Sequence, residues 1–582
     1  MSIALMHPNP AMHVMTRPVG RPVTRSVSKQ VCALSVLSLA LLASFPTWAQ
    51  TPPDAGQTQR DLQRQPLVPP PESRDPLRIQ KGSTTPLPAA DGSRIAVRAI
   101  TVSGNSAFSS SQLQRLVGDL VGGEHTLTEL DQAAARITDW YRRHGYAVAR
   151  AYIPAQEIRD GVLQIKVLEG HIGQQHLQNS SRVPDATLAA YLAAEPAGAL
   201  VQVAPINRGL LLLNDLPGIG SARASLQPGA SVGSSDLMVQ VDPSAPYNGS
   251  VALDNYGNRY TGEYRLGGNF AWNNPLLQRG DVLNARVLTS GPGLSYARLA
   301  YQVPVGGDGW RLGAAYSALH YRLGRDFEAL DGHGTADNAS LYATYPLLRS
   351  QASNLGLVAM YEHKDLRDRF GAVPEQDSNK ALDVLTIGLS GSRYDALFGG
   401  GVSTLDLTLA QGRVHTEIPS SVVTPAISND FTRFGYSVSR LQNLGPIAAL
   451  SATLSGQWAN RNLNSSEQFV LGGANGVRAY PQGEGAGDEG WLLNLELRRT
   501  LWAGVQGSLF YDAGTVKISH NPVVDQNNTR HLAGAGVGLN AVLGAVQLKA
   551  SLAWRTQGGV PNSEPASASH DPRFWLQAAL PF

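Results

Sequence analysis

A transmembrane β-barrel of about sixteen antiparallel strands, preceded by two small α/β modules, is the fold class that this sequence predicts. After Tyr247 the chain divides into segments of about ten residues in which apolar and polar side chains alternate. The connections between these segments are alternately short and long, and two of the long ones are expected near Arg322–Ala336 and Lys364–Asn379. Strands with apolar residues on one face and Arg, Glu and Asn on the other fit a barrel with a lipid-facing outside and a wet lumen.

The composition agrees with this class. The chain has 582 residues and a net charge of +2, and its 60 glycines and 36 prolines favour turns over long helices. So small a basic excess gives no indication of nucleic-acid binding. The sequence contains neither a G-x-x-x-x-G-K-[ST] loop for ATP phosphates nor an H-E-x-x-H pair. We therefore expect no cofactor and no metal site.

Residues 1–49 are predicted to be a secretory signal peptide. Basic residues precede the apolar run Val31–Leu42, which is too short to span a membrane, and Thr47-x-Ala49 offers small residues for cleavage. The only cysteine, Cys32, lies in this segment, so the mature chain is expected to contain no disulfides. No later run reaches about 18 uninterrupted apolar residues. If the exported chain enters a membrane, it does so as strands.

Residues 50–92 have the composition of a periplasmic linker. They are rich in Pro and Gln and poor in apolar residues, as in Pro66–Pro71, so they cannot bury a core of their own. Within them Gln57–Gln65 is compatible with either a short polar helix or plain linker.

Two consecutive modules with the same element order follow, over residues 93–170 and 171–243. In the first, Ile95–Val102 alternates as a strand, Thr128–His144 has apolar residues at helical spacing, and two short strands complete the unit. In the second, we expect two helices followed by two strands. A repeated β-α-α-β-β unit ahead of a barrel suggests a periplasmic docking arm.

The barrel is expected to span residues 244–582. In Glu263–Trp272 the side chains of Leu266, Phe270 and Trp272 share one face, and Arg265 and Asn269 share the other. Outer-membrane barrels have short periplasmic turns and long external loops, and an even strand number leaves both barrel ends in the periplasm, beside the modules. The last strand alternates and ends at Phe582, which resembles the signal by which the barrel assembly machinery recognises outer-membrane proteins.

The stretch that most suggests a functional element is the loop 471–490. Seven of its twenty residues are glycine, and a single arginine, Arg478, lies at its centre. So many glycines allow tight backbone folding without Cβ clashes. A shaped loop with one arginine, held between two amphipathic strands, suggests a gate or plug.

The modules carry the residues of a known domain family. The element order together with Tyr141, Gly145-Tyr146, Pro154, Gly161 and Glu169-Gly170 resembles the POTRA (polypeptide-transport-associated) domain, and Leu211–Gly218 looks like the family's second copy. The resemblance implies that these domains bind unfolded polypeptide, and an exposed strand edge is able to accept a guest strand. The alternative is that the modules only separate the barrel from other machinery.

Taken together, residues from about Gln57 to Phe582 resemble the Omp85 superfamily, and within it the TpsB transporters of two-partner secretion, of the ShlB/FhaC/HecB type. Val477-Arg478-Ala479-Tyr480 is similar to the family's VRGY loop motif, with alanine where glycine is usual. Phe510-x-Asp512-x-Gly514 is similar to its F-x-D-x-G strand motif. The resemblance implies that Arg478 enters the lumen and forms an ion pair with Asp512. Alternatively, Arg478 is a solvated loop residue.

The resemblance also implies a mechanism without nucleotide and without enzymatic chemistry. The POTRA domains would capture a secreted, unfolded TpsA-type exoprotein of the haemolysin, haemagglutinin or adhesin type, the helix near residues 57–65 would leave the pore, and the loop would move. The barrel would lie among the lipids of the outer membrane, with the POTRA domains in the periplasm.

Three other classes of protein share features with this sequence. Gly229-Ala-Ser231-Val-Gly233 has the spacing of a hydrolase nucleophile motif, but it falls in a predicted turn between strands. An Omp85-type assembly factor that inserts other membrane proteins is the main alternative, although such factors usually carry more than two POTRA domains. A diffusion porin would not need the N-terminal modules.

Overall fold

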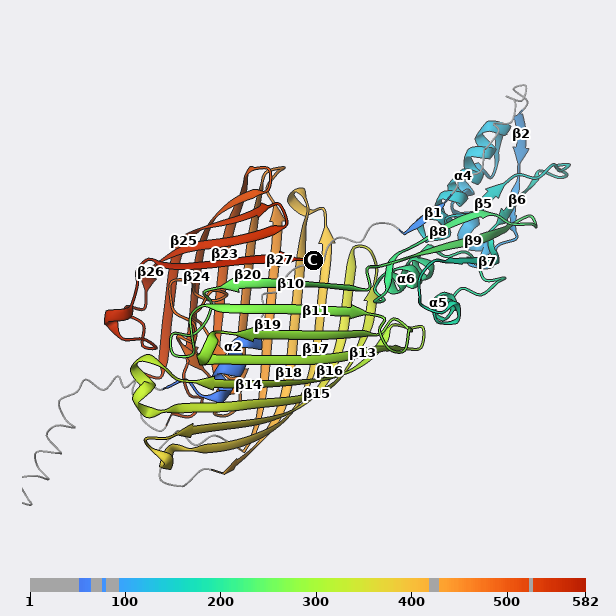
Figure 1. The fold of residues 1–582 in the computed structure, drawn as a ribbon. Helices are drawn as coiled ribbons and strands as arrows, with labels where there is room; N and C mark the ends of the chain where they lie inside the picture. The colour runs from blue at the N-terminus through green and yellow to red at the C-terminus, as the bar shows by residue number, and fades with distance from the viewer. Residues whose placement is uncertain (1–51, 64–75, 80–93, 418–428, 523–526) are drawn as a thin grey trace, which may run out of the picture. The chain divides into compact units, whose positions relative to one another are not determined.

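Sixteen strands close into an antiparallel barrel in the computed structural model of the chain, which describes residues 52–63, 76–79, 94–417, 429–522 and 527–582 (Figure 1). The predicted class is therefore confirmed. The predicted signal peptide, residues 1–49, lies outside the described residues. The barrel strands are β10 Tyr247–Asp254, β11 Arg265–Asn273, β12 Val282–Thr289, β13 Leu294–Val305, β14 Trp310–Arg322, β15 Gly332–Arg349, β16 Ser353–Phe370, β17 Ser378–Asp395, β18 Gly401–Glu417, β19 Asp430–Asn443, β20 Ala448–Ala459, β23 Glu489–Trp502, β24 Val505–Lys517, β25 Thr529–Leu543, β26 Val546–Gln557 and β27 Arg573–Pro581.

The last strand closes the barrel against the first. β27 pairs with β10 in antiparallel register, with Leu580 opposite Val251, and Phe582 exchanges backbone hydrogen bonds with Gly249. Closure leaves neither strand with an unpaired edge, and unpaired backbone groups are not tolerated in lipid. The apolar side chains of β27 that the alternation predicts to face outward, Phe574, Leu576 and Leu580, are indeed exposed.

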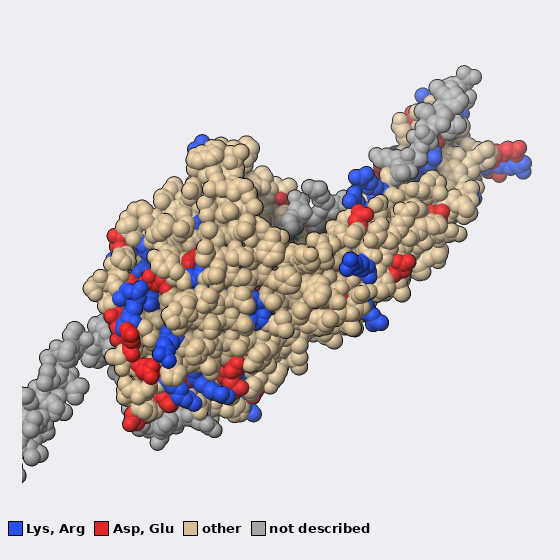
Figure 2. All heavy atoms as spheres, in the orientation of Figure 1, with Lys and Arg blue, Asp and Glu red and all other residues tan. Residues whose placement is uncertain are grey.

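Alternation along the strands separates an apolar outside from a polar lumen. On β11, Leu266, Phe270 and Trp272 are exposed on the outer surface, whereas Asn269 lines an internal cavity. In Figure 2 the charged side chains on the visible barrel surface gather toward one end, and most of the remaining visible wall is uncharged. This is the distribution expected of a wall that faces hydrocarbon.

Four strands are much longer than the ten residues that the sequence suggests. β15, β16 and β17 each have 18 residues and β18 has 17, so that parts of the segments we expected to be long loops near 322–336 and 364–379 are strand. The outward residues of these extensions are polar, including His363, Asp365 and Asp383. Polar outward positions weaken the alternation signal, which explains why the sequence underestimates these strands.

No helix among the described residues is long and apolar enough to cross a membrane. The same residues contain no group of three or more His, Cys, Asp or Glu side chains arranged to hold a metal ion.

The first module packs two helices on short strands. Its elements are β2 Arg94–Val97, β3 Ala99–Ser103, α3 Ser110–Arg115, β4 Gly123–Thr126, α4 Leu127–Arg143, β5 Arg150–Tyr152 and β6 Val162–Leu168. The segment 95–102, expected as one strand, is divided at Arg98, because the backbone N–H groups of Arg98 and Ala99 both donate to the Gly161 carbonyl. β2 then pairs with β4, and β3 pairs with β6.

The second module contains β7 His171–Asn179, α5 Asp185–Leu192, α6 Val203–Asn214, β8 Ile219–Pro228 and β9 Ser234–Pro243. Its sheet has a fourth strand that the sequence did not predict, β1 Leu77–Ile79, which pairs in parallel with β8. The interpretation of residues 50–92 as linker throughout is therefore wrong at these positions. Leu77 is the only residue of β1 that is buried in the module's core. A three-residue strand with one buried residue is too short to show an alternating pattern in the sequence.

A second part of the same region forms the helix α2, Ala55–Gln63. It begins two residues before the predicted candidate, and Arg64 and Gln65 lie outside the described residues. Ala55 and Leu62 are buried against side chains from the barrel strands, such as Tyr321 and Leu366. The helix is therefore a polar segment with a small apolar face inside the barrel.

A buried carboxylate joins two of the residues that identify the first module. Glu169 accepts hydrogen bonds from the backbone N–H groups of Ser106 and Ala107 and from the Tyr141 hydroxyl at 2.6 Å. Burial acts to raise the pKa of Glu169, but the hydrogen bonds from Ser106, Tyr141 and Ala107 outweigh it and hold the pKa below its usual value. Burial and the same carboxylate raise the pKa of Tyr141.

We predict that Glu169→Gln destabilises the first module by about 1–3 kcal/mol, because buried donors lose their charged acceptor. Since the folded pKa is lowered, the stabilisation is fully present above the unfolded value of about 4.3 and is lost as pH falls through the folded value. Hydrogen exchange of residues 94–170 in the full chain is the measurement. The control is Glu157→Gln, an exposed carboxylate of the same module. Equal protection in both variants would contradict the role of Glu169.

Candidate functional site in the barrel lumen

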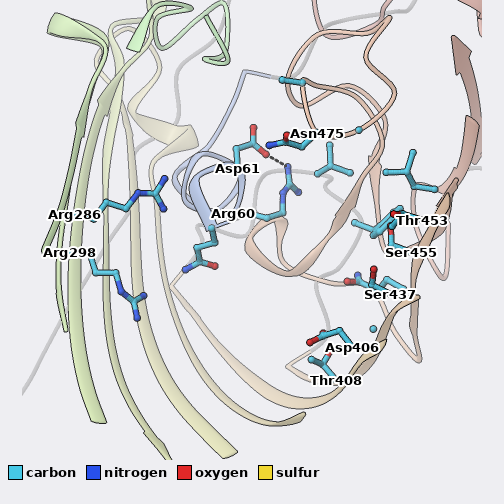
Figure 3. Close-up of a pocket in the computed structure, with 18 of the residues that line it drawn as sticks. Arg60, Asp61, Arg286, Arg298, Asp406, Thr408, Ser437, Thr453, Ser455 and Asn475 are labelled. Carbon is cyan, nitrogen blue, oxygen red and sulfur yellow. Dashed lines mark hydrogen bonds and ion pairs between the residues drawn. The ribbon is translucent and has the colours of Figure 1, made fainter. Parts of the chain in front are cut away.

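The glycine-rich loop 471–490 lies inside the barrel. Its residues Leu471, Val477 and Tyr480 are completely buried. The loop is connected to the wall on one side by β21 Phe469–Val470 and β22 Ala486–Gly487, a short pair of strands at its base. Beside it remains a cavity of about 1350 Å³, lined by residues of the loop, of α2 and of the barrel strands (Figure 3).

Arg478 is brought to Asp512 in a bidentate ion pair. Its Nε lies 2.8 Å from Asp512 Oδ2 and its Nη2 lies 2.9 Å from Oδ1. The remaining terminal nitrogen, Nη1, donates to Glu496 at 3.0 Å, and the backbone N–H of Arg478 donates to Asp512 at 3.1 Å. Asp512 is completely buried and Arg478 is 8% exposed. The alternative of a solvated Arg478 is not what the structure contains.

Each residue of the strand motif contacts the loop. The Phe510 ring lies under the guanidinium, with 3.4 Å between the ring centre and Arg478 Cζ, a cation–π geometry. Gly514 leaves room for Leu471, because a Cβ at this position would come within 2.6 Å of the Leu471 side chain. Since β24 alternates, residues 510, 512 and 514 all face the lumen and supply an aromatic surface, a carboxylate and a gap.

The other residues of the loop motif fix its position. Val477, Ala479 and Tyr480 pack with Leu492, Phe510 and neighbouring inward side chains in one apolar cluster. The Tyr480 hydroxyl donates to the Gln557 carbonyl at 2.7 Å. Trp575 Nε1–H donates to the Arg478 carbonyl at 2.7 Å, so that the closing strand β27 also contacts the motif.

Three acidic residues that the sequence did not single out also attach the loop region to the wall. Glu484 pairs with Arg530 at 2.9 Å and accepts from the backbone N–H groups of Asn562 and Ser563. Glu467, in the turn Ser465–Glu467 before the loop, pairs with Lys364 at 2.7 Å and Arg433 at 3.1 Å. Asp488 accepts from the backbone of Leu463 and His520. In the sequence, Glu484 and Asp488 lie among the glycines of the loop and Glu467 lies shortly before it. These acidic residues were the sequence signal that could have indicated the contacts.

The helix α2 is bound to the turn that precedes the loop. Ser465 Oγ–H donates to the carboxylate of Asp54, just before the helix, and lies 2.7 Å from both of its oxygens; Arg60 donates to the Ser465 carbonyl at 2.8 Å. Gly56 lies so close to this turn that a Cβ would be 2.4 Å from Ser465 Oγ. On the opposite side, the N–H of Ala55 donates to Asp368 on β16 at 2.8 Å.

The hydrolase-like motif lies elsewhere. Ser231 is in the turn between β8, which ends at Pro228, and β9, which begins at Ser234. Its hydroxyl donates to the Ser234 hydroxyl at 3.1 Å. A nucleophilic serine of this kind needs a strand-to-helix turn and a base within reach, and this turn joins two strands of a hairpin.

We predict that Arg478→Ala weakens the attachment of the loop by about 3–5 kcal/mol, because it leaves Asp512 buried without its counter-ion. The double variant Arg478→Ala/Asp512→Ala is expected to weaken it by less than the sum of the single variants, since no unpaired carboxylate remains. Native-state hydrogen exchange of residues 471–490 measures both. Additive effects would show that the two side chains act independently.

We also predict that Gly534→Ala displaces the loop. Gly534 lies on β25, and an added Cβ would come within 2.4 Å of the Ala479 Cβ. Replacing Ala479 with glycine removes that atom, so Gly534→Ala/Ala479→Gly is expected to recover part of the protection that Gly534→Ala loses. The recovery is partial because the new Cβ also lies 3.0 Å from the Trp554 carbonyl. Equal exchange in the single and double variants would contradict this packing.

Comparison with known proteins finds relatives that match nearly the whole chain. The chain is 28% identical over 566 residues to the heme/hemopexin transporter protein HuxB of Haemophilus influenzae, covering 94% of this chain and 98% of HuxB. It is 26% identical over 545 residues to the outer membrane transporter CdiB of Escherichia coli, covering 90% of each. The solved structure of CdiB from Escherichia coli matches with a TM-score of 0.69 at 23% identity, over 94% of this chain and 98% of CdiB, which shows the same fold.

Two protein-family models match successive parts of the chain, the first module and most of the barrel. Residues 95–170 match the ShlB-type POTRA domain. Residues 233–541, more than half of the chain, match the family described as haemolysin secretion/activation protein ShlB/FhaC/HecB. The chain therefore belongs to the ShlB/FhaC/HecB family, the outer-membrane transporters of two-partner secretion.

Proposed function

We propose that this transporter exports a large unfolded exoprotein of the haemolysin, haemagglutinin or adhesin type through the barrel lumen, which α2 and the loop 471–490 close at rest. The observation that carries the proposal is that hydrogen bonds, ion pairs and apolar packing attach both elements to the wall. Such contacts break and re-form without a chemical step, so that an arriving chain is able to compete for them. We propose no catalytic role for Ser231 or for any other residue.

The two elements are proposed to move in a linked way. Asp54 and Arg60 of the α2 region bind Ser465, and the next residues, Ser466 and Glu467, lead into the loop. Removal of α2 would therefore free the Ser465 side chain and carbonyl beside the Glu467 anchor. Arg478 and Asp512 would hold the loop until the passenger reaches it.

The POTRA domains are proposed to bind the passenger in the periplasm. β1 covers the β8 edge of the second sheet, so a guest strand would add to the other edge, β7, or replace β1. In the first domain the outer strands of the sheet are β3 and β5. Addition to an edge uses backbone hydrogen bonds and therefore suits a passenger without fixed sequence.

Two further partners complete the proposal. The exposed apolar side chains of the barrel wall would contact outer-membrane lipids. The alternating last strand, with Phe582 at its end, would be the segment that the barrel assembly machinery recognises. A role in inserting other outer-membrane proteins is the alternative function, and depletion of the chain would then reduce the level of other barrels.

The test is a reversible lock on α2. Gly56→Cys/Ser465→Cys places two thiols within reach of a disulfide, and the predicted mature chain contains no other cysteine. We expect the oxidised double variant to release none of a co-expressed exoprotein and the reduced double variant to release it as the Gly56→Cys single variant does, since an added Cβ at position 56 by itself displaces the turn. Each single cysteine variant is the control. Equal release by the oxidised double variant would show that α2 does not need to leave the lumen.

A further inference from the structure

Two arginines face the lumen side by side on neighbouring strands. Arg286 on β12 and Arg298 on β13 are direct register partners, and both line the internal cavity. Figure 3 shows both side chains pointing from the wall into the cavity. Like charges directly opposite each other destabilise an antiparallel pair. Their presence at one register position therefore needs an explanation other than the stability of the barrel.

Their neighbours on the wall do not neutralise them. The register partner of Arg286 on β11 is Asn269, and that of Arg298 on β14 is Ser317, both uncharged. Within the part of the chain that the structure describes, neither arginine forms an ion pair, and Arg298 has no hydrogen-bond partner either. Of the two acids labelled in Figure 3, Asp61 on α2 pairs with Arg60, and Asp406 on β18 lies on the far side of the cavity. Among the described residues, Arg298 therefore presents unpaired donors to the lumen, whereas Arg286 has the Tyr296 ring 5.8 Å from its Cζ and no carboxylate partner.

One of the two already binds a peptide carbonyl. Arg286 Nη1 donates to the carbonyl of Leu62 at 3.2 Å, in the last turn of α2. The carbonyls of the last turn of a helix have no partner within the helix and carry partial negative charge, so that a cation there is stabilising. At rest, the C-terminal end of α2 thus occupies part of this basic site, and Arg298 remains free.

We propose that Arg286 and Arg298 form a binding site for carbonyl and carboxylate groups, occupied by the end of α2 at rest and by the passing exoprotein after α2 has left. This inference rests on the proposed export function. A planar guanidinium binds carboxylates in a bidentate manner and also accepts single carbonyls. Every residue of an extended chain offers a carbonyl, so the site would act on any passenger segment and more strongly on acidic ones.

The ion selectivity of the channel tests the site without any passenger. Full-length wild type, Arg286→Gln and Arg298→Gln would be inserted in planar lipid bilayers, and reversal potentials measured across a KCl gradient. We expect each variant to lower the chloride-to-potassium permeability ratio by about twofold or more, because basic side chains in a pore favour anions. Arg286→Gln is also expected to raise the open fraction, since it removes a contact to α2.

Two control variants separate charge from structure. Arg298→Lys keeps the charge and is expected to keep the wild-type ratio. Arg499→Gln removes one arginine from β23 at an exposed position on the outward face and is also expected to leave the ratio unchanged. An unchanged ratio in both Arg286→Gln and Arg298→Gln would overturn the proposal, because the two charges would then not act on anions in the pore.

Secretion decides whether the site acts on the passenger. With the exoprotein co-expressed, we expect Arg286→Gln/Arg298→Gln to release it about tenfold more slowly than wild type, which is the factor that corresponds to the loss of one good polar contact. Arg298→Lys is expected to release it at the wild-type rate. A shifted permeability ratio with wild-type secretion would overturn the passenger role. If wild type itself releases no exoprotein while the ratio still shifts, the export function fails and the anion site remains.

Discussion

The ion pair between Arg478 and Asp512 is the interaction on which the closed lumen depends. All three guanidinium nitrogens of Arg478 donate hydrogen bonds, two to Asp512 and one to Glu496. The ring of Phe510 covers one face of the guanidinium group. Both charges are nearly or completely buried, so that breaking the pair in place is unfavourable unless water or another ligand takes over. In the mechanism that we propose, the loop detaches when water or the passenger takes over these contacts.

The remaining attachments follow the same principle. Glu484 and Glu467 accept from Arg530 and Lys364 on distant barrel strands, and Asp488 accepts from the backbone of the connections that contain Leu463 and His520. The barrel itself is held by continuous backbone ladders between its strands, which do not depend on any of these side chains. This separation lets the contents of the lumen rearrange without loss of the wall, as a transporter of polypeptide requires.

The charge distribution of the lumen gives the resting helix a second role. α2 is bound at its start through Asp54 and Ala55, and in its last turn through Arg60 and through the Arg286 guanidinium on the Leu62 carbonyl. It therefore covers wall groups that would otherwise face water in an open pore. In the mechanism that we propose, departure of α2 uncovers donors for the polypeptide that enters the lumen, so that closure and transport use the same surface at different times.

The sequence by itself determined the barrel class and the two motifs that contain Arg478 and Asp512, and it predicts a signal peptide. Each of these depends on a local pattern. A period of two along β11 or β27 is set by the pleat of a strand, and Arg478 and Asp512 are recognisable because each lies in a short motif. Other features depend on which distant segments become neighbours. The addition of Leu77–Ile79 to β8, the Arg530 partner of Glu484 and the direct opposition of Arg286 and Arg298 follow from strand register and chain closure. In the hairpin of β12 and β13 the register depends on the turn between the two strands, and the other two contacts join segments that are far apart in the sequence, so only the tertiary structure decided where these side chains meet.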